Sequence, residues 1–283
     1  MCIRGSGFLG AAIMDGGLHF ISGLPRAGST LLAALLRQNP RIQAGMTSPV
    51  GSLTAALLRE MSQGNESAVF IDDAQRAAVL RAVFAAYYAG GRPLVFDTNR
   101  MWCARLPLLA TLFPRAKVVC CVRHVPWVLD SIERLIRGNP LQLSRIFNFD
   151  PGGTVYSRVE GLGSGAGLVG YAWNALREAA WGGQADRLLF VTYESLTAAP
   201  QRVLDAVYEF IGEPSFTHDP ANLRFDDATE FDARLGTPGL HRVGPVVQAP
   251  VRRSILPPDL FARYEPDSFW RNPATRPEGL RVV

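Results

Sequence analysis

Four short stretches of the chain are apolar at nearly every position, without the alternation of apolar and polar residues that marks a strand with one face in water. Such runs are typical of parallel strands that are buried on both faces of a sheet. The pattern therefore predicts core strands at Leu18–Ser22, Pro93–Asp97, Val118–Val122 and Arg187–Tyr193.

Between these runs the apolar residues recur at spacings of three and four, which predicts amphipathic helices. Asp72 and Asp73 stand at the start of one helix, and Pro126 and Pro200 occupy the opening turns of two others. Helices are predicted at Thr30–Gln38, Val50–Ser62, Asp72–Tyr88, Trp102–Phe113, Val125–Arg137, Leu168–Trp181 and Pro200–Ile211. Strands that alternate with helices predict an α/β fold of three layers, with a central parallel sheet flanked by helices.

No internal repeat or strong linker divides the chain, so we expect one domain over residues 16–283. Residues 1–15 are interpreted as a disordered leader, or as an over-long start ahead of Met14. The proline-rich part at 213–283 has little periodicity, and we expect an irregular segment that wraps the domain and closes over the site.

The composition of the chain excludes several classes of function. The chain has 283 residues, 48% of them hydrophobic, with a net charge of +4, which suits a globular protein that binds a small polyanion but not nucleic acid. Lys117 is the only lysine among 29 basic residues, which argues against Schiff-base catalysis and a standard kinase loop. The four cysteines lack metal-site spacing, and Cys120–Cys121 lies in a core strand, so we expect a reduced, cytoplasmic, metal-free protein. No apolar run reaches membrane length.

The most informative segment joins the first predicted strand to the first predicted helix and reads Gly-Leu-Pro-Arg-Ala-Gly-Ser-Thr-Leu. Gly23 and Gly28 have the spacing of a phosphate-binding P-loop, in which backbone N–H groups and the helix start cradle an anion. Ser29 stands where a kinase has its lysine, and the cation is Arg26, inside the loop. The sequence therefore predicts an anion cradle with a different task from that of a kinase loop.

A second constellation follows the strand that ends at Val122. Arg123 lies at the carboxyl end of that strand, where open α/β sheets bind ligands, and Ser131 follows about two helical turns later. The two side chains can share one phosphate group, although Arg123 could equally serve as an ordinary ion-pair partner.

The loop and the strand–Arg–Ser pattern, in this order and about a hundred residues apart, resemble the sulfotransferases that use 3′-phosphoadenosine 5′-phosphosulfate (PAPS). The resemblance is to the branch of the tyrosylprotein sulfotransferases and their bacterial relatives, where arginine replaces the lysine of the cytosolic branch. It spans residues 18–212. It implies transfer of a sulfuryl group from PAPS to a hydroxyl or amine, in line and without a metal, with the 3′,5′-bisphosphate PAP as product.

The resemblance also implies roles for particular residues. The 5′-phosphosulfate loop would be Arg26, Ala27, Gly28, Ser29, Thr30 and Leu31, with Arg26 as the counter-charge of the leaving group. Arg123 and Ser131 would hold the 3′-phosphate, and Tyr193 would lie near the adenosine or simply pack a strand end. Arg242, in a turn-rich basic segment, is a further expected contact of the 3′-phosphate.

The general base is harder to assign, because the glutamate that the tyrosylprotein branch places after the loop helix is absent from the stretch Gly45–Pro49. Asp97, at the end of a predicted core strand, is the first candidate, although it could instead cap a helix or pair with Arg100. Arg100 is expected to contact sulfate or acceptor. His124 is the second candidate base, and the other histidines, at positions 19, 218 and 241, have no supporting pattern.

The sequence is also compatible with two other functions: a P-loop-type nucleotide kinase or NTPase, and a nucleotide-binding module without turnover. The acceptor is left open among a peptide, a carbohydrate, a lipid and a small metabolite, and a homodimer is compatible with the sequence. An insert at 138–170 is expected to form part of the acceptor wall through Phe147, Phe149 and Tyr156. Its glycine-rich run at 161–167 predicts a mobile loop.

Overall fold

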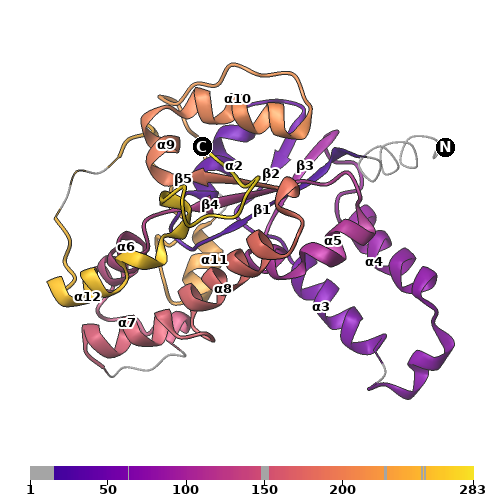
Figure 1. The fold of residues 1–283 in the computed structure, drawn as a ribbon, viewed down its shortest axis with the longest axis horizontal. Coiled ribbons are helices and arrows are strands. Elements are labelled where there is room, and N and C mark those ends of the chain that lie inside the picture. Colours follow the sequence, from indigo (N-terminus) through magenta and orange to yellow (C-terminus); the bar gives the residue numbers. More distant parts are fainter. Residues whose placement is uncertain (1–15, 63, 148–152, 226–227, 250, 252) are drawn as a thin grey trace.

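The computed structural model describes residues 16–62, 64–147, 153–225, 228–249, 251 and 253–283. In this part of the chain six strands form one sheet in the order β2-β3-β1-β4-β5-β6, and every neighbouring pair is parallel (Figure 1). The strands are β1 (Leu18–Gly23), β2 (Ile42–Ala44), β3 (Leu94–Thr98), β4 (Val118–Val122), β5 (Leu188–Thr192) and β6 (Arg281–Val282). The predicted α/β fold with a central parallel sheet is confirmed.

The three middle strands are buried along their whole length, as their apolar runs predict. Phe20 of β1 lies beside Val118 of β4 and Asp97 of β3 in the parallel register. Strands in the middle of a parallel sheet have both faces covered by helices, so apolar residues are required at successive positions.

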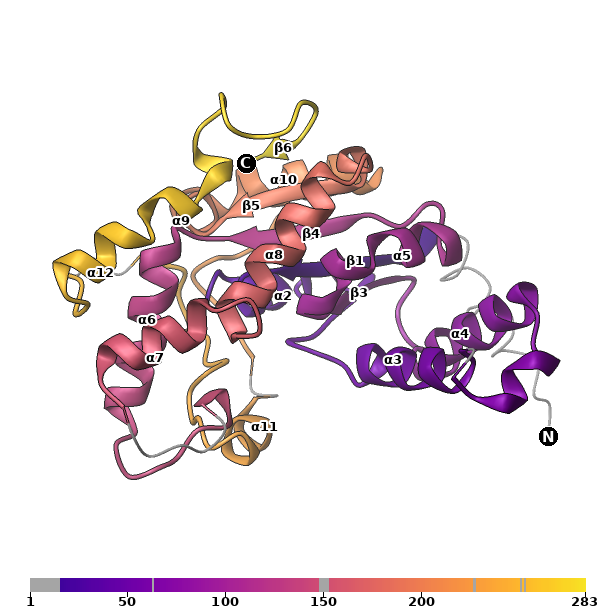
Figure 2. The ribbon, with the colours of Figure 1, turned by 60° about the horizontal axis from the view of Figure 1, so that its bottom comes forward.

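Helices cover both faces of the sheet. Figure 1 shows α2 and α10 on one face and α8 on the other, and Figure 2 shows α8 crossing the strands. The helices are α2 (Ser29–Leu36), α3 (Val50–Glu60), α4 (Asp73–Tyr87), α5 (Leu106–Leu112), α6 (Val125–Gly138), α7 (Val155–Gly163), α8 (Leu168–Trp181), α9 (Tyr193–Ala198), α10 (Pro200–Ile211), α11 (Thr229–Arg234) and α12 (Pro258–Arg263).

The sequence prediction missed the two edge strands, since β2 and β6 have only three and two residues and no apolar run of their own. The helix predicted at 102–113 is in two parts, a 3-10 helix η3 (Arg100–Arg105) followed by α5. The mobile loop predicted at 161–167 is wrong in part, because its first three residues form the end of α7.

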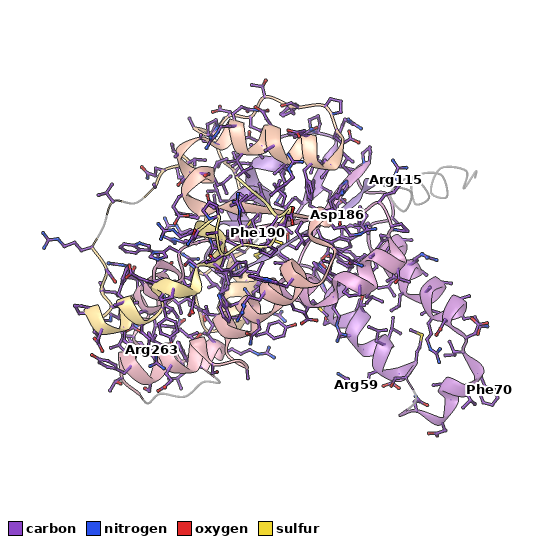
Figure 3. All side chains as sticks on the ribbon, viewed as in Figure 1. Arg59, Phe70, Arg115, Asp186, Phe190 and Arg263 are labelled. Carbon is purple, nitrogen blue, oxygen red and sulfur yellow. The ribbon has the colours of Figure 1, made fainter. Side chains whose placement is uncertain are left out.

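Helices α3 and α4 form a hairpin that projects from the body of the molecule (Figures 1 and 2). Its tip carries exposed apolar side chains, with Phe70 82% exposed, and Arg59 lies on the same projection (Figure 3). Among the described residues no helix combines the length and the apolar character needed to cross a membrane.

Strands β1, β3 and β4 end at Gly23, Thr98 and Val122, on the same edge of the sheet. The loops that leave these ends bring the predicted site residues together. From residue 213 onward the described residues contain short helices and the strand β6, and residues 240–248 extend across this edge. The leader predicted at 1–15 lies outside the described residues.

Candidate active site

The loop between β1 and α2 has an unusual backbone. Gly23 and Gly28 have φ of 112° and 95°, and Arg26, at 58°, is the only described residue other than glycine with a positive φ. A Cβ atom on Gly23 would lie 2.1 Å from the carbonyl oxygen of Cys121 in β4. The left-handed conformation costs an L residue about 1–2 kcal/mol, so the fold stores strain at Arg26.

The start of α2 is open to an anion. Its first hydrogen bond runs from the Leu32 N–H to the Gly28 carbonyl at 2.8 Å, so the amides before Leu32 have no acceptor within the helix. The N-cap residue, Gly28, has no side chain that could cap this end, and no acidic residue lies in the first turn. The helix dipole and the open amides therefore favour a bound anion.

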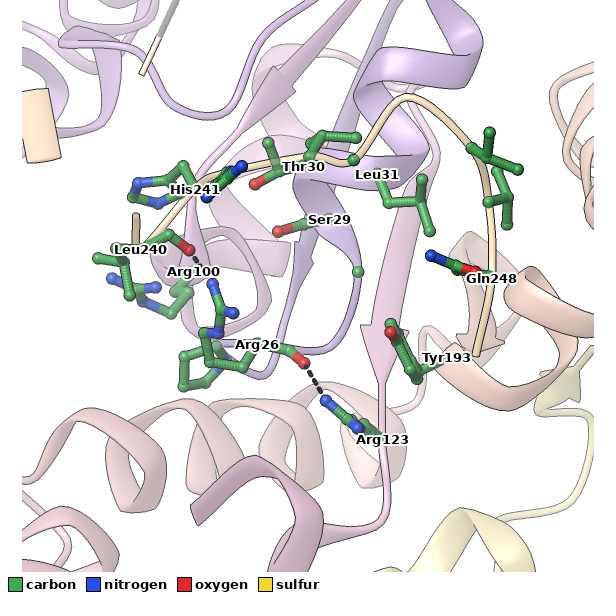
Figure 4. A pocket seen from close by; sticks show the side chains of 17 residues that line it. Arg26, Ser29, Thr30, Leu31, Arg100, Arg123, Tyr193, Leu240, His241 and Gln248 are labelled. Carbon is green, nitrogen blue, oxygen red and sulfur yellow. Dashed lines mark hydrogen bonds between the residues drawn. The ribbon is translucent and has the colours of Figure 1, made fainter. Parts of the chain in front are cut away.

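A cavity of about 180 Å³ lies over this helix start (Figure 4). The described residues that line it include four arginines and neither aspartate nor glutamate. The arginines are Arg26, Arg100, Arg123 and Arg242. A cavity with this surplus of positive charge suits a ligand with several negative charges.

Arg26 joins the two constellations that the sequence separates by about a hundred residues. Its Nε donates to the Ser131 Oγ at 3.1 Å, and its Nη1 donates to the Leu240 carbonyl. The Arg26 carbonyl accepts from the Arg123 Nη1 at 3.3 Å, and the Arg123 guanidinium lies 4.1 Å from the centre of the Tyr193 ring. The predicted phosphate residues thus form one contact network.

The other residues predicted for the nucleotide are found in or beside the same cavity. Ser29, Thr30, Leu31 and Arg242 line it. Ala27 is a buried residue of the loop, and Ser131 contacts Arg26 but does not line the cavity. In Figure 4, Tyr193 and Gln248 lie at one end of the cavity and Leu240 and His241 at the other.

Arg100 lies on the lining of this cavity and of a second one of about 200 Å³. Burial lowers the pKa of Arg100, yet a guanidinium keeps its charge in any protein environment. Within the described part of the chain no hydrogen bond or ion pair holds this guanidinium. It is therefore available to a ligand in either cavity.

Asp97 is placed differently from what the sequence suggests. It is fully buried and lines neither cavity. Its carboxyl accepts three hydrogen bonds, from Ser48 Oγ and Tyr88 OH at 2.5 Å each and from Trp102 Nε1 at 2.7 Å. Burial raises the pKa of Asp97, while the three hydrogen bonds lower it. This geometry does not support the prediction that Asp97 takes a proton from the acceptor.

The other candidate base and the two described aromatic residues of the insert also lie apart from the cavities. His124 is mostly buried at the start of α6 with its ring against Phe261, and burial lowers its pKa. Phe147 and Tyr156 line neither cavity near Arg100, and Tyr156 is half exposed. Phe149 lies outside the described residues.

Sequence reasoning missed a histidine–aspartate pair at the junction of the two cavities. The Asp232 carboxylate contacts His241 twice, with 2.6 Å from Oδ1 to the ring Nδ1 and 2.9 Å from Oδ2 to the backbone N. His241 lines both cavities, together with Ser29, Arg100 and Leu240. The spacing of nine residues between the two has no regular-element signature, so only the fold reveals the pair.

In the described part of the chain no group of three or more His, Cys, Asp and Glu side chains is arranged to hold a metal ion.

A search of curated protein sequences found no match. Solved structures that resemble this fold include a sulfotransferase from Alicyclobacillus acidocaldarius (15% identity, 77% of this chain and 91% of that chain, TM-score 0.47). Another is the sulfotransferase domain of the Synechococcus PCC 7002 olefin synthase (18% identity, 87% of this chain and 86% of that chain, TM-score 0.45). A third is mouse sulfotransferase SULT7A1 complexed with PAP (16% identity, 82% of this chain and 68% of that chain, TM-score 0.42).

The sequence model of the sulfotransferase family matches residues 19–218, which include the phosphate loop, Arg123, Ser131 and Tyr193. This match favours sulfuryl transfer over the nucleotide-kinase reading. The chain belongs to the sulfotransferase family.

Proposed function

We propose that this protein transfers the sulfuryl group of PAPS to a hydroxyl or amine of an acceptor. The observation that carries the proposal is the arginine-lined cavity over the open start of α2, in a chain of the sulfotransferase family. PAPS, when bound, supplies the sulfuryl group, and its phosphates are the anions that such a cavity would hold.

The residues around the nucleotide cavity have separate roles. Arg26 and the first-turn amides of α2 hold the 5′-phosphosulfate, and Arg26 stabilises the negative charge that develops on the leaving oxygen. It acts as a fixed charge rather than a proton donor, because a guanidinium does not deprotonate near neutral pH. Arg123 and Arg242 bind the 3′-phosphate, with Ser131 supporting through Arg26, and Tyr193 faces the adenosine.

The acceptor binds in the second cavity, which shares Arg100 and His241 with the nucleotide cavity. Met46, Phe231 and Leu235 give this cavity apolar walls, and its volume of about 200 Å³ suits a small group. We therefore favour a partly apolar hydroxyl compound, or a single side chain of a larger acceptor, over an extended carbohydrate.

Two finer assignments belong to the same proposal. Arg26 stands in the loop as in the tyrosylprotein branch, which supports placing the chain near that branch. Cys103, Cys120 and Cys121 are buried free thiols, which supports a reduced, cytoplasmic setting.

The test measures nucleotide binding and sulfuryl transfer separately. PAP binding is measured by calorimetry, and transfer of ³⁵S from PAPS is measured with a panel of phenols, alcohols and amines, with and without EDTA. We expect 1:1 PAP binding, transfer that EDTA leaves unchanged, and PAP affinity at least tenfold weaker in Arg123→Ala. Arg59→Ala, an exposed arginine on the projecting hairpin, is the matched control.

The proposal fails if PAP does not bind, or if PAPS is bound but never cleaved. Phosphoryl transfer from ATP that requires Mg²⁺ would instead support the kinase reading.

A further inference from the structure

The junction of the two cavities is where a sulfuryl group would pass from one ligand to the other. Four of the described residues line both cavities: Ser29, Arg100, Leu240 and His241. A hydroxyl acceptor must lose its proton as its oxygen attacks. Of these four, Arg100 is a permanent cation, Leu240 is apolar and the Ser29 hydroxyl is a very weak base, which leaves His241.

Resting on the proposed function, we propose that His241 is the general base of the reaction and that Asp232 is its positioning residue. His241 takes the acceptor's proton on Nε2. A bond forms between the acceptor oxygen and sulfur, and the bond between sulfur and the bridging oxygen of the 5′-phosphate breaks. The electron pair leaves with that oxygen, beside Arg26, and the proton on His241 later passes to solvent.

Asp232 fixes both the orientation and the tautomer of the ring. Its Oδ2 accepts from the backbone N–H of His241 and its Oδ1 from Nδ1, so the two contacts hold backbone and ring to one carboxylate. With the hydrogen on Nδ1, the lone pair of a neutral ring is on Nε2. Asp232 is itself buried in α11, and the Phe231 ring packs 5.7 Å from the His241 ring.

The charges around the ring favour the neutral form that a base requires. Burial lowers the pKa of His241, and the positive charges of Arg100 and Arg26 lower it further, while Asp232 acts in the opposite direction. The net effect lowers the pKa of His241 below its ordinary value, which favours the neutral ring.

The first experiment needs no turnover. The chain has only four histidines, so the ¹⁵N imidazole signals of the full protein can be resolved. The signal that disappears in His241→Gln belongs to His241. We expect a neutral ring with hydrogen on Nδ1 in the parent protein. In Asp232→Asn the backbone N–H still needs an acceptor and holds the amide oxygen, so the amide NH₂ faces Nδ1. The hydrogen must then move to Nε2.

The second experiment measures PAP release from PAPS with phenols of graded acidity and with water. His241→Gln should lower kcat by about 10²–10⁴-fold with weakly acidic acceptors, which is the usual range of general-base catalysis. The loss should shrink to a few-fold with a phenol that is already ionised, since it has no proton to give. Asp232→Asn should lose kcat with weakly acidic acceptors in the same way, and its kcat should no longer fall toward low pH. Glu230→Gln, on the same helix, should change neither the dependence on acceptor acidity nor the pH profile.

PAP affinity and melting temperature are recorded for each variant, so that a damaged fold is recognised. Equal losses with all phenols, unchanged turnover in His241→Gln, or a hydrogen on Nε2 in the parent protein would each overturn the inference. In those cases the parent still binds PAP and cleaves PAPS. A parent protein that does neither refutes the proposed function instead.

Discussion

Two substitutions of the buried Asp97 test whether its carboxyl supports the fold or acts in catalysis. Asp97→Ala should destabilise the fold, whereas Asp97→Asn should keep both the fold and the turnover. Asp97→Ala removes the acceptor of three hydrogen bonds, from Ser48, Tyr88 and Trp102. Each buried donor left without a partner costs about 1–3 kcal/mol, so we expect a loss of about 3 kcal/mol or more. A typical domain has only about 5–15 kcal/mol of stability, so this variant should be severely destabilised.

Asp97→Asn should keep the fold. The Trp102 indole N–H can only donate, so it holds the amide oxygen, and the amide NH₂ then faces Ser48 and Tyr88. Both of these groups are hydroxyls, which can turn and accept. All three contacts survive, and the group no longer ionises.

The stability of the parent protein depends on pH through Asp97, because burial raises the pKa of this carboxyl. A carboxyl with a higher pKa in the folded than in the unfolded state stabilises fully below the unfolded pKa, and that contribution is lost as the pH rises through the folded pKa. An amide does not titrate. Relative to the parent, Asp97→Asn should therefore gain stability as the pH rises through the folded pKa.

Urea unfolding from pH 4 to 8 measures these differences, and Asp73→Asn, an exposed carboxylate on α4, is the control. Turnover of PAPS is measured on the same samples. We expect Asp97→Asn to keep it within about threefold, because the carboxyl faces the core and not a cavity. A loss of about 10²-fold or more with PAP affinity intact would refute this reasoning and restore Asp97 as the base.

Three further outcomes are expected. Arg26→Ala should lower kcat by about 10²–10³-fold in the ³⁵S assay, because it removes the charge next to the leaving oxygen; a loss confined to PAP affinity would contradict that role. Ser131→Ala removes one hydrogen bond to the Arg26 Nε, worth about 1 kcal/mol, and should weaken PAP binding about fivefold by calorimetry with little effect on kcat. Gly23→Ala should destabilise the fold by about 3 kcal/mol or more in urea, because its Cβ would lie 2.1 Å from the Cys121 carbonyl oxygen at a φ of 112°; a normal urea midpoint would show that the loop tolerates a side chain there.

Much of the architecture could be predicted from local sequence. Runs such as Val118–Val122 are typical of a strand covered on both faces, and the structure confirms that prediction. The prediction failed where an element depends on its neighbours. β2 has three residues and is a strand because its backbone pairs with β3, and the end of α7 is helical although its glycines are typical of a loop.

For the site, the sequence determined the local parts. The glycine spacing of the phosphate loop, the position of Arg26 and the step from Arg123 to Ser131 are short-range features, and backbone geometry fixes where such residues lie relative to a strand end. The contact between Arg26 and Ser131 follows once β1 and β4 are adjacent, because both strands then end at the same edge.

Only the tertiary structure decided which groups face the cavities. Asp97 lies near the carboxyl end of β3, but its position in the sequence does not say what its side chain contacts; in the fold Ser48, Tyr88 and Trp102 surround the carboxyl, away from both cavities. His241 reaches the site because the C-terminal part of the chain crosses the loop, where the Leu240 carbonyl accepts from Arg26, 214 residues earlier. Contacts over such separations depend on packing of the whole chain, so no local pattern in the sequence marks His241 and Asp232 as a pair.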